Sequence, residues 1–379
     1  MAEVADLTGL GPLESEWREL AVGRGNGFLT PEWVGAWARH YAEGHPPFVP
    51  VLRGTDGKLR GLLPIALPRS GHPRVCRIAG ANLGDRFHPV CEAGSEAEVA
   101  AAVGEALSDA PQPWSVISLD HVQTDEPWVE ALGEATGRRL STRSRVAAPL
   151  PLIDVATHES WDAYLGTRSS NFRQQVRRFA RRAAREADVR IRRTEAADTL
   201  ETDMGTFFAL HDQRFGERGG SSLSAERARS FHLDFARAAL ERGWLRLWFL
   251  ELDGRPAAAW YGWRLGERYS YYNSGFDPEF GALSPGLVLI SAVIQSAFEE
   301  GASEFDFLLG EESYKYRFAE RERTVSDVTL ARALPHPASI VTAAEYGARR
   351  AGRLIPASAR RRLGLGRLAR RSLMGGRGR

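Results

Sequence analysis

Hydrophobic and polar positions follow two different periods along this chain, and the mixture predicts a mixed α/β protein. Short runs rich in β-branched and aromatic residues indicate strands at 48–53, 59–68, 75–78, 115–120, 245–252, 256–265 and 268–273. Apolar residues spaced three or four positions apart indicate helices at 13–21, 31–41, 96–107, 128–136, 168–185, 199–215, 225–242 and 287–300. The order of these elements favours sheets flanked by helices.

The stretch 266–318 has the most informative order of elements. An aromatic strand at 268–273 leads into a loop with Asp277, Gly281, Ser284, Pro285 and Gly286. An apolar helix at 287–300 and a second strand at 304–309 follow, and the crossover makes the second strand parallel to its neighbour. The amides and dipole at the start of such a helix suit an anion, and ligands gather near the ends of such strands. The stretch therefore predicts a βαβ unit with an anion site.

A weak internal duplication predicts two domains. Residues 48–67 and 245–265 share an apolar strand, an Asp-Gly turn and a longer strand, and helices precede both. A chain of 379 residues also exceeds one typical core. We expect an N-terminal domain at 1–148, a C-terminal domain at 149–335 and a tail at 336–379.

Charge is distributed unevenly. The net charge is +2, but residues 349–379 contribute 11 arginines and no acid, so residues 1–348 carry −9. Only Lys58 and Lys315 are lysines. Two interpretations of 349–379 stay open: a basic amphipathic segment for an anionic membrane surface, or a disordered solubilising tail.

The predicted helix at 168–185 is the most basic one outside the tail. Phe172, Val176, Phe179 and Ala183 form one apolar stripe, and ten arginines lie between 168 and 193. The arginines form either a solvated face or a ridge that attracts phosphate or an anionic polymer.

Several kinds of chemistry find no support in the sequence. Cys76 and Cys91 give neither a disulfide framework nor a metal site, and no metal cofactor is expected. His211 and His232 lie on predicted helices without a nucleophile, so we interpret both as structural histidines with satisfied hydrogen bonds. No signal peptide or run of 18 apolar residues is present, which favours a cytoplasmic protein, with the tail as a means of peripheral association with the inner face of the membrane.

A family resemblance rests on linked motifs in order. The segments YYNSGFDPEFGALSPG, EEGASEFDFLLG and EESYKYRFA, with SSNFRQQVRRFARRAAREADVRI and ELDGRPAAAWYGW before them, resemble the BioF2-like or CelD-type acetyltransferase domain. That family belongs to the GNAT superfamily and is similar to the FemAB aminoacyl-tRNA-dependent transferases. The resemblance covers roughly 150–330, and FLTPEWVGAW and GLLPIALP extend it loosely to the N-terminal half. It implies two tandem GNAT-like domains, each a mixed, mostly antiparallel sheet flanked by helices, followed by a basic helical tail.

The resemblance also implies a donor and a site for it. Acetyl-CoA or another acyl-CoA would be the co-substrate, with its phosphates at the loop before the helix at 287–300. The residues expected to bind it are Gly281, Ser284, Pro285, Gly286 and Leu287. GNAT enzymes usually carry a Gln/Arg-x-x-Gly-x-Gly/Ala loop there, and FGALSPG departs from that pattern.

Catalytic candidates follow the second strand of the unit. Lys315 in YKYRF matches the position of a lysine in the active region of FemAB-like enzymes and could stabilise negative charge on the acyl oxygen. A carboxylate, Glu311 or Asp306, or the hydroxyl of Tyr314, could take the proton of the acceptor. The alternative roles are a strand-end cap for Asp306 and a solvated loop for Glu311.

Three functions remain open from the sequence. The first is acyl transfer from acyl-CoA to an amine or hydroxyl of a small molecule, saccharide or peptidoglycan precursor, in cell-envelope, exopolysaccharide or cellulose biosynthesis. The second is aminoacyl transfer from charged tRNA, with the helix at 168–185 holding the RNA. The third is a non-catalytic scaffold on a degenerate GNAT fold.

Overall fold

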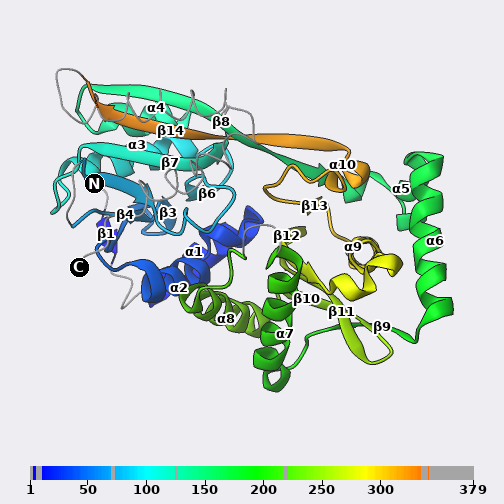
Figure 1. Ribbon diagram of the computed structural model, residues 1–379. Coiled ribbons are helices and arrows are strands. Elements are labelled where there is room, and N and C mark those ends of the chain that lie inside the picture. The colour runs from blue at the N-terminus through cyan, green and yellow to red at the C-terminus, as the bar shows by residue number, and fades with distance from the viewer. Residues whose placement is uncertain are drawn as a thin grey trace.

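The protein is described by a computed structural model that covers residues 3–5, 11–69, 73–123, 127–216, 221–333 and 340 (Figure 1). The tail predicted at 336–379 therefore lies outside the described residues, apart from Ile340. Within them the strands form one 14-stranded sheet in the order β6-β3-β2-β4-β5-β7-β14-β8-β13-β12-β11-β10-β9, with β1 paired to β2. The predicted mixed α/β class is confirmed.

The strands agree with the hydrophobic pattern at 47–66, 75–78, 116–123, 245–276 and 304–306, whereas those at 3–5, 90–91, 140–153, 189–193 and 321–332 were not predicted. They are β1 (Glu3–Ala5), β2 (Pro47–Arg53), β3 (Leu59–Leu62), β4 (Ile65–Ala66), β5 (Val75–Ile78), β6 (Val90–Cys91), β7 (Val116–Gln123), β8 (Leu140–Ile153), β9 (Val189–Arg193), β10 (Leu245–Leu252), β11 (Arg255–Leu265), β12 (Arg268–Phe276), β13 (Glu304–Asp306) and β14 (Arg321–Arg332).

The helices are α1 (Pro12–Gly23), α2 (Pro31–Tyr41), α3 (Glu96–Ser108), α4 (Trp128–Ala135), α5 (Trp161–Thr167), α6 (Ser170–Glu186), α7 (Ala197–Gly216), α8 (Glu226–Glu241), α9 (Pro285–Glu299) and α10 (Lys315–Phe318). Capping side chains mark the starts of α2 and α6. Thr30 caps α2 by accepting from the Trp33 amide, and Ser169 caps α6 in the same way. Among the described residues, no helix combines the length and hydropathy needed to cross a bilayer.

Two long strands carry the sheet from the N-terminal to the C-terminal half. β14 pairs with β7 on one side and with β8 on the other, and β8 also pairs with β13 (Figure 1). The domain boundary predicted between residues 148 and 149 falls inside β8. The backbone ladder is thus continuous where the two predicted domains would meet.

An aromatic core also joins the two halves. Trp33 of α2 lies edge-on to Phe231 and Phe235 of α8, with ring centroids 4.8 and 4.9 Å apart, and it is fully buried. Trp263 of β11 packs edge-on against Phe28, at 5.3 Å. Burial of such large rings is worth several kcal/mol, so this contact fixes the N-terminal helices against the C-terminal sheet.

The predicted βαβ unit is confirmed as β12–α9–β13, with the two strands parallel. β13 is shorter than predicted, however. It ends at Asp306 because Leu308 takes a left-handed conformation, with φ of 53°, which strand geometry does not allow. β12 is longer than predicted and continues to Phe276.

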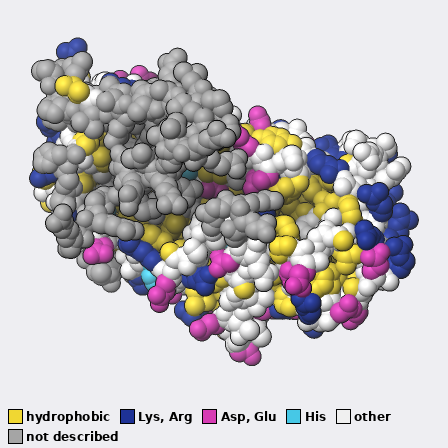
Figure 2. All heavy atoms as spheres, viewed as in Figure 1, with side chains coloured by type: hydrophobic (Ala, Val, Ile, Leu, Met, Phe, Trp, Pro, Cys, Tyr) yellow, Lys and Arg dark blue, Asp and Glu magenta, His cyan; other side chains and the backbone are white. Residues whose placement is uncertain are grey.

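Helix α6 presents the basic face expected from its sequence. Phe172, Val176 and Ala183 are buried, and Phe179 packs against the same core. Arg177, Arg178, Arg181 and Arg185 are exposed. Figure 2 shows Lys and Arg side chains gathered on the edge of the molecule where α6 lies in Figure 1. α6 packs against α9 and against the 3-10 helix η3 (Pro278–Leu283), so the helix adjoins the loop before α9.

Strand β12 approaches helix α7 unusually closely at Gly275. A Cβ atom on Gly275 would lie 2.3 Å from the His211 amide nitrogen and 2.4 Å from the Leu210 carbonyl carbon. Because both atoms belong to the backbone, no side chain can move aside to relieve the clash. The absent side chain therefore sets the distance between β12 and α7.

We predict that Gly275→Ala lowers the free energy of unfolding by about 1–3 kcal/mol, since it overpacks a backbone contact. Urea denaturation of the purified variant measures the change. Gly281→Ala is the matched control, because a Cβ there meets nothing within 4 Å. Equal stability of the two variants would contradict the close approach.

Candidate active site

The site begins where β12 and β13 stop pairing. Their last register pair is Ser270 with Asp306. Beyond it β12 continues to Phe276, whereas the chain after Asp306 turns away through Phe307 and Leu308. The separation leaves the second half of β12 without a neighbour on this side, and two pockets lie beside it.

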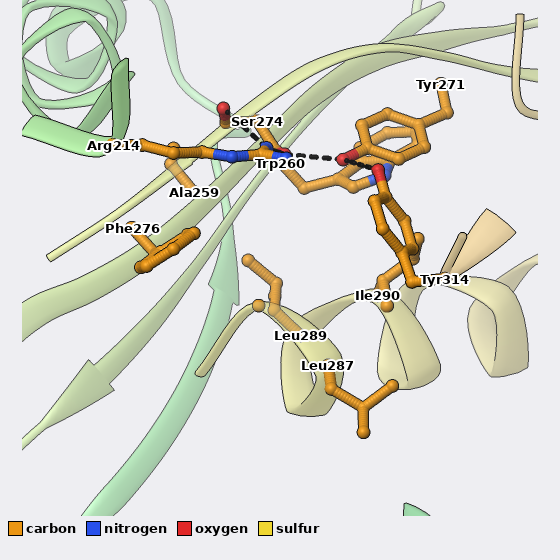
Figure 3. A pocket seen from close by; sticks show the side chains of 12 residues that line it. Arg214, Ala259, Trp260, Tyr271, Ser274, Phe276, Leu287, Leu289, Ile290 and Tyr314 are labelled. Atoms are coloured by element: carbon orange, nitrogen blue, oxygen red, sulfur yellow. Dashed lines mark hydrogen bonds between the residues drawn. The ribbon is translucent and has the colours of Figure 1, made fainter. Parts of the chain in front are cut away.

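The first pocket, of about 210 Å³, lies between β12, β11 and the first turns of α9 (Figure 3). Its lining is mostly apolar, from Ala259, Trp260, Phe276, Leu287, Leu289 and Ile290. Gly286 of α9 also borders it. This is a narrow site suited to an apolar chain or small acyl group.

The second pocket, of about 500 Å³, is polar. It is lined by His211, Arg214, Phe215, Ser221, Ser222, Ser224, Tyr271, Tyr272, Asn273, Leu309, Glu312, Tyr314 and Lys315. Arg214, Tyr271 and Tyr314 border both pockets, so these three side chains form a shared wall.

A row of hydroxyl groups runs along this wall (Figure 3). Arg214 donates from Nη1 to both the carbonyl and the hydroxyl oxygen of Ser274. The Tyr271 hydroxyl lies 2.5 Å from the Ser274 hydroxyl, and the Tyr314 hydroxyl donates to Tyr271 at 2.9 Å. Burial raises the pKa of Tyr314 well above its usual value, although Arg214 opposes the shift. Tyr314 is therefore protonated at neutral pH, next to a permanent cation.

Lys315 holds the chain that leaves β13. Its Nζ atom donates to the carbonyl oxygens of Phe307 (3.0 Å) and Leu309 (2.7 Å) and lies 3.2 Å from Glu312 Oε2. The side chain is buried, and Nζ is 5.7 Å from the centre of the Tyr271 ring. All three ammonium protons have a partner in this arrangement. Its position therefore fits a residue that shapes the polar pocket by clamping a loop.

The residues predicted to bind the donor lie in different places around the start of α9. Gly286 and Leu287 border the apolar pocket, whereas Gly281 lies in η3. Ser284, rather than a glycine, has the left-handed conformation at the helix start, with φ of 51°.

This helix start offers few free amides. Pro285 has no N–H, and the amides of Leu287 and Val288 both donate to the Ser284 carbonyl oxygen. Among the described contacts of this first turn, the Gly286 amide remains for a ligand.

Comparison with known proteins relates one part of the chain to a family. Residues 170–316 match the family model described as "Acetyltransferase (GNAT) domain". This part of the chain is a GNAT acetyltransferase domain. The site just described lies within it, since β12, α9, β13 and α7 all belong to the matched range. No curated protein matches the sequence significantly.

Solved structures extend the likeness in fold to most of the chain. A structure of FemX has a TM-score of 0.60 and 14% identity, covering 86% of this chain and 96% of its own. The C-terminal domain of a putative lysylphosphatidylglycerol synthetase from Agrobacterium fabrum has a TM-score of 0.56 and 13% identity, covering 87% of this chain and 94% of its own. L-PGS from Bacillus licheniformis has a TM-score of 0.52 and 12% identity, covering 84% of this chain and 91% of its own. At these identities the likeness is one of fold.

Two predicted acid–base residues of the GNAT domain lie apart from the pockets. Asp306 is buried, accepts the Leu308 amide on Oδ1 at 2.8 Å, and has Arg323 and Arg86 at 3.6 and 3.9 Å. Burial raises the pKa of its carboxyl, and Arg86 opposes the shift. Glu311 is exposed in the loop. Tyr314 and Lys315, by contrast, both border the polar pocket.

The N-terminal half contributes a residue that sequence reasoning missed. Asp85 accepts the Leu309 amide on Oδ2 at 3.2 Å, and Lys315 and His121 are near enough to influence its carboxyl. Burial raises its pKa to about 6 and Asp306 adds to the shift, whereas His121, the Leu309 amide and Lys315 only partly offset it. Asp85 thus ties a loop of the N-terminal half to the chain that leaves β13. No local pattern marks such a long-range contact.

The histidine interpretation needs one correction. His211 has the Ser221 hydroxyl 2.8 Å from its Nδ1, so its ring is hydrogen-bonded as expected. His232 is not satisfied: neither ring nitrogen has a hydrogen-bond partner among the described residues, and the ring packs among aromatic side chains. Burial lowers the pKa of His232 to about 3, which keeps it neutral.

We predict a pH-dependent stability difference between wild type and Asp85→Asn. Because the folded pKa of Asp85 is raised to about 6, its contribution is fully present below its unfolded value of about 3.9 and is lost as pH rises through 6. Asn mimics the neutral acid and still accepts an amide. The variant should match wild type near pH ~4 and exceed it by roughly 1–3 kcal/mol near pH ~8.

Urea denaturation of both proteins across this pH range measures the difference. A gap that stays constant with pH would contradict the raised pKa.

Proposed function

We propose that the GNAT domain transfers an acyl group, acetyl in the simplest case, from acyl-CoA to an amine or hydroxyl acceptor. The observation that carries the proposal is the row from Arg214 to Tyr314 on the wall between an apolar and a polar pocket. A thioester placed in the apolar pocket and an acceptor placed in the polar one would meet at this wall. The acceptor would be a small molecule, a saccharide or a peptidoglycan precursor.

The row can supply a proton to the sulfur of the leaving group, where negative charge develops. Each hydroxyl both donates and accepts, so the row can reverse direction. Arg214 then still donates to Ser274, while the proton of Tyr314 faces the pocket. A leaving thiolate takes that proton, and Arg214 stabilises the charge left on the row.

The reaction as a whole moves one proton from the acceptor to the leaving sulfur. The acceptor nitrogen or oxygen attacks the thioester carbonyl carbon, the new bond forms and the C–S bond breaks. The proton given by Tyr314 to sulfur is replaced by the proton that the acceptor loses. Tyr314 therefore acts first as acid and then as base.

The anionic part of the donor needs more than the start of α9. With Pro285 at the first position and two amides engaged by Ser284, the helix offers mainly the Gly286 amide. The exposed arginines of α6, which packs against α9 and η3, would supply charge for the phosphates of CoA. In this arrangement, arginine side chains take the place of the phosphate-binding loop that GNAT enzymes usually carry.

The same arginine face favours a second candidate, in which the acyl carrier is a tRNA. A ridge of exposed arginines along α6 suits a phosphate backbone. The family that this chain resembles is similar to the FemAB aminoacyl-tRNA-dependent transferases, and the likenesses in fold include FemX, a domain of a putative lysylphosphatidylglycerol synthetase and L-PGS. In this version an aminoacyl ester replaces the thioester at the same wall.

Our placement of the activity in cell-envelope or exopolysaccharide biosynthesis, in the cytoplasm and at the membrane surface, rests on the family resemblance. The basic segment 349–379 would provide the membrane contact, through charge attraction to anionic lipids. This part of the proposal concerns residues outside those that the structure describes.

We predict that Tyr314→Phe lowers kcat by about 10²-fold or more, because it removes the terminal proton donor of the row. Tyr271→Phe interrupts the row and should have a similar effect. Tyr316→Phe, an exposed tyrosine two positions away, is the matched control and should leave kcat unchanged. Release of free thiol from acetyl-CoA, measured with a panel of amine and hydroxyl acceptors, gives the rates.

The same assay separates the candidates. Turnover with aminoacyl-tRNA alone, weakening steeply with salt, would select the tRNA-dependent version. Unchanged kcat in both Tyr→Phe variants would refute the role of the row. Absence of turnover and of binding with either donor would favour the scaffold.

A further inference from the structure

Two buried hydrogen-bond donors without partners border the apolar pocket. The indole nitrogen of Trp260 and the Nε atom of Arg214 are both buried, and neither has a hydrogen-bond partner among the residues that the structure describes. Both side chains line the pocket between β12, β11 and α9 (Figure 3). A buried N–H group without an acceptor costs stability, so two of them around one pocket point to an acceptor that the ligand brings.

Packing decides which end of Trp260 is left for the pocket. Its side chain is buried and stacks on the Tyr271 ring, with centroids 5.3 Å apart and planes at 30°. A Cβ atom on Gly262 would lie 2.7 Å from Cη2 and 3.0 Å from Cζ3 of the indole, so the benzo ring fills the space that this glycine leaves. Gly262 does not line the pocket, whereas Trp260 does. The pyrrole ring, which carries Nε1, is therefore the end nearer the pocket.

Arg214 is held in place by atoms other than Nε. Its Nη1 donates to the carbonyl and hydroxyl oxygens of Ser274, and its guanidinium carbon lies 4.9 and 5.6 Å from the ring centres of Phe215 and Phe276. These contacts fix the guanidinium and leave Nε without an acceptor. Lys315, the other cation of the site, has acceptors for all three of its protons. Arg214 Nε and Trp260 Nε1 are thus the side-chain donors that remain for a ligand in the apolar pocket.

We propose that Trp260 Nε1 and Arg214 Nε bind the carbonyl oxygen of the acyl thioester and stabilise the oxyanion that forms when the acceptor attacks. The inference rests on the proposed direct transfer, in which the row of hydroxyls serves the leaving sulfur and no group has yet been assigned to the oxygen. Donors that are fixed before the reaction bind an oxyanion more strongly than a neutral carbonyl oxygen, and this difference lowers the barrier.

The two donors give up no proton in this step. As the acceptor bonds to the carbonyl carbon, the π electrons of the C=O bond move onto the oxygen, where the two N–H groups stabilise the charge. The C=O bond re-forms as the C–S bond breaks. The electron pair of the C–S bond leaves with the sulfur, which takes the proton of Tyr314. The acyl group therefore passes directly from donor to acceptor.

Trp260→Phe tests the role of the indole in turnover, since it keeps an aromatic ring but removes the N–H group. We expect kcat to fall about 10²-fold with little change in KM, because the hydrogen bond strengthens only as the oxyanion forms. Thiol release from acetyl-CoA gives both constants.

Trp248→Phe is the matched control. The indole nitrogen of Trp248 is also buried without a partner among the described residues, but Trp248 borders neither pocket of the site. Its kcat should equal that of wild type. An unchanged kcat in Trp260→Phe, or an equal loss in both variants, would overturn the proposal.

A second measurement uses the wild-type protein and serves if the melting temperature shows that Trp260→Phe fails to fold. The probes are the ketone analogue of acetyl-CoA, in which a methylene group replaces the sulfur, and S-ethyl-CoA, which lacks the carbonyl oxygen. In protein that carries isotope-labelled tryptophan, one indole N–H resonance should move downfield with the ketone and not with the thioether, because only the ketone offers an acceptor.

The outcomes separate this inference from the proposed function. Binding of both analogues with no indole resonance that distinguishes them would overturn the oxyanion site and leave acyl-CoA binding intact. Binding of neither analogue would overturn the proposed donor, and this inference with it. Tyr314→Phe should lose turnover but keep the ketone-specific shift, because it leaves both donors in place.

Discussion

The site depends on the parting of two parallel strands. β12 and β13 share three register pairs and then separate, so backbone groups that would pair across the sheet need other partners. Buried charges provide them. Lys315 binds the carbonyls of Phe307 and Leu309, while the carboxylates of Asp306 and Asp85 take the amides of Leu308 and Leu309. Leu308 keeps its left-handed conformation because these hydrogen bonds fix the backbone on both sides of it.

The charged side chains around Asp306 and Glu304 come from both halves of the chain. Arg323 of β14 donates to Glu304 at 2.7 Å and lies 3.6 Å from Asp306, and Arg86 from the N-terminal half lies 3.9 Å from Asp306. Burial lowers the pKa of Arg86 to about 10, and Asp306 partly offsets this. Removing one partner of such a buried set leaves an uncompensated charge, so the halves are coupled electrostatically as well as through their aromatic core.

The sequence was informative wherever local chemistry decides the structure. Thr30 and Ser169 cap helices whose ranges the apolar spacing predicted, and the crossover around α9 gave parallel strands as expected. The end of β13 was misplaced because burial and ion pairs, rather than local propensity, hold Leu308 in its left-handed conformation. Tyr314 and Lys315 were chosen from the motif YKYRF, and both border the polar pocket.

The contacts that surround these two residues could not be predicted in the same way. Arg214 is more than fifty residues from Ser274, and Asp85 is more than two hundred from Leu309, so no periodicity or motif relates them. The alternation of β12 could have pointed to Tyr271, which shares its face with Tyr269. Side chains brought together by the sheet and by α7 require the fold to be known.

Calorimetric titration of acetyl-CoA into wild type and Gly286→Val tests the central claim most directly. A Cβ atom at residue 286 would have only Phe276, at 3.8 Å, within 4 Å, so there is room for a valine at the border of the apolar pocket, next to the free amide. We predict binding to wild type, a loss of affinity of about tenfold or more in the variant, and an unchanged melting temperature. Equal affinity of the two proteins would contradict a donor site between β12 and α9.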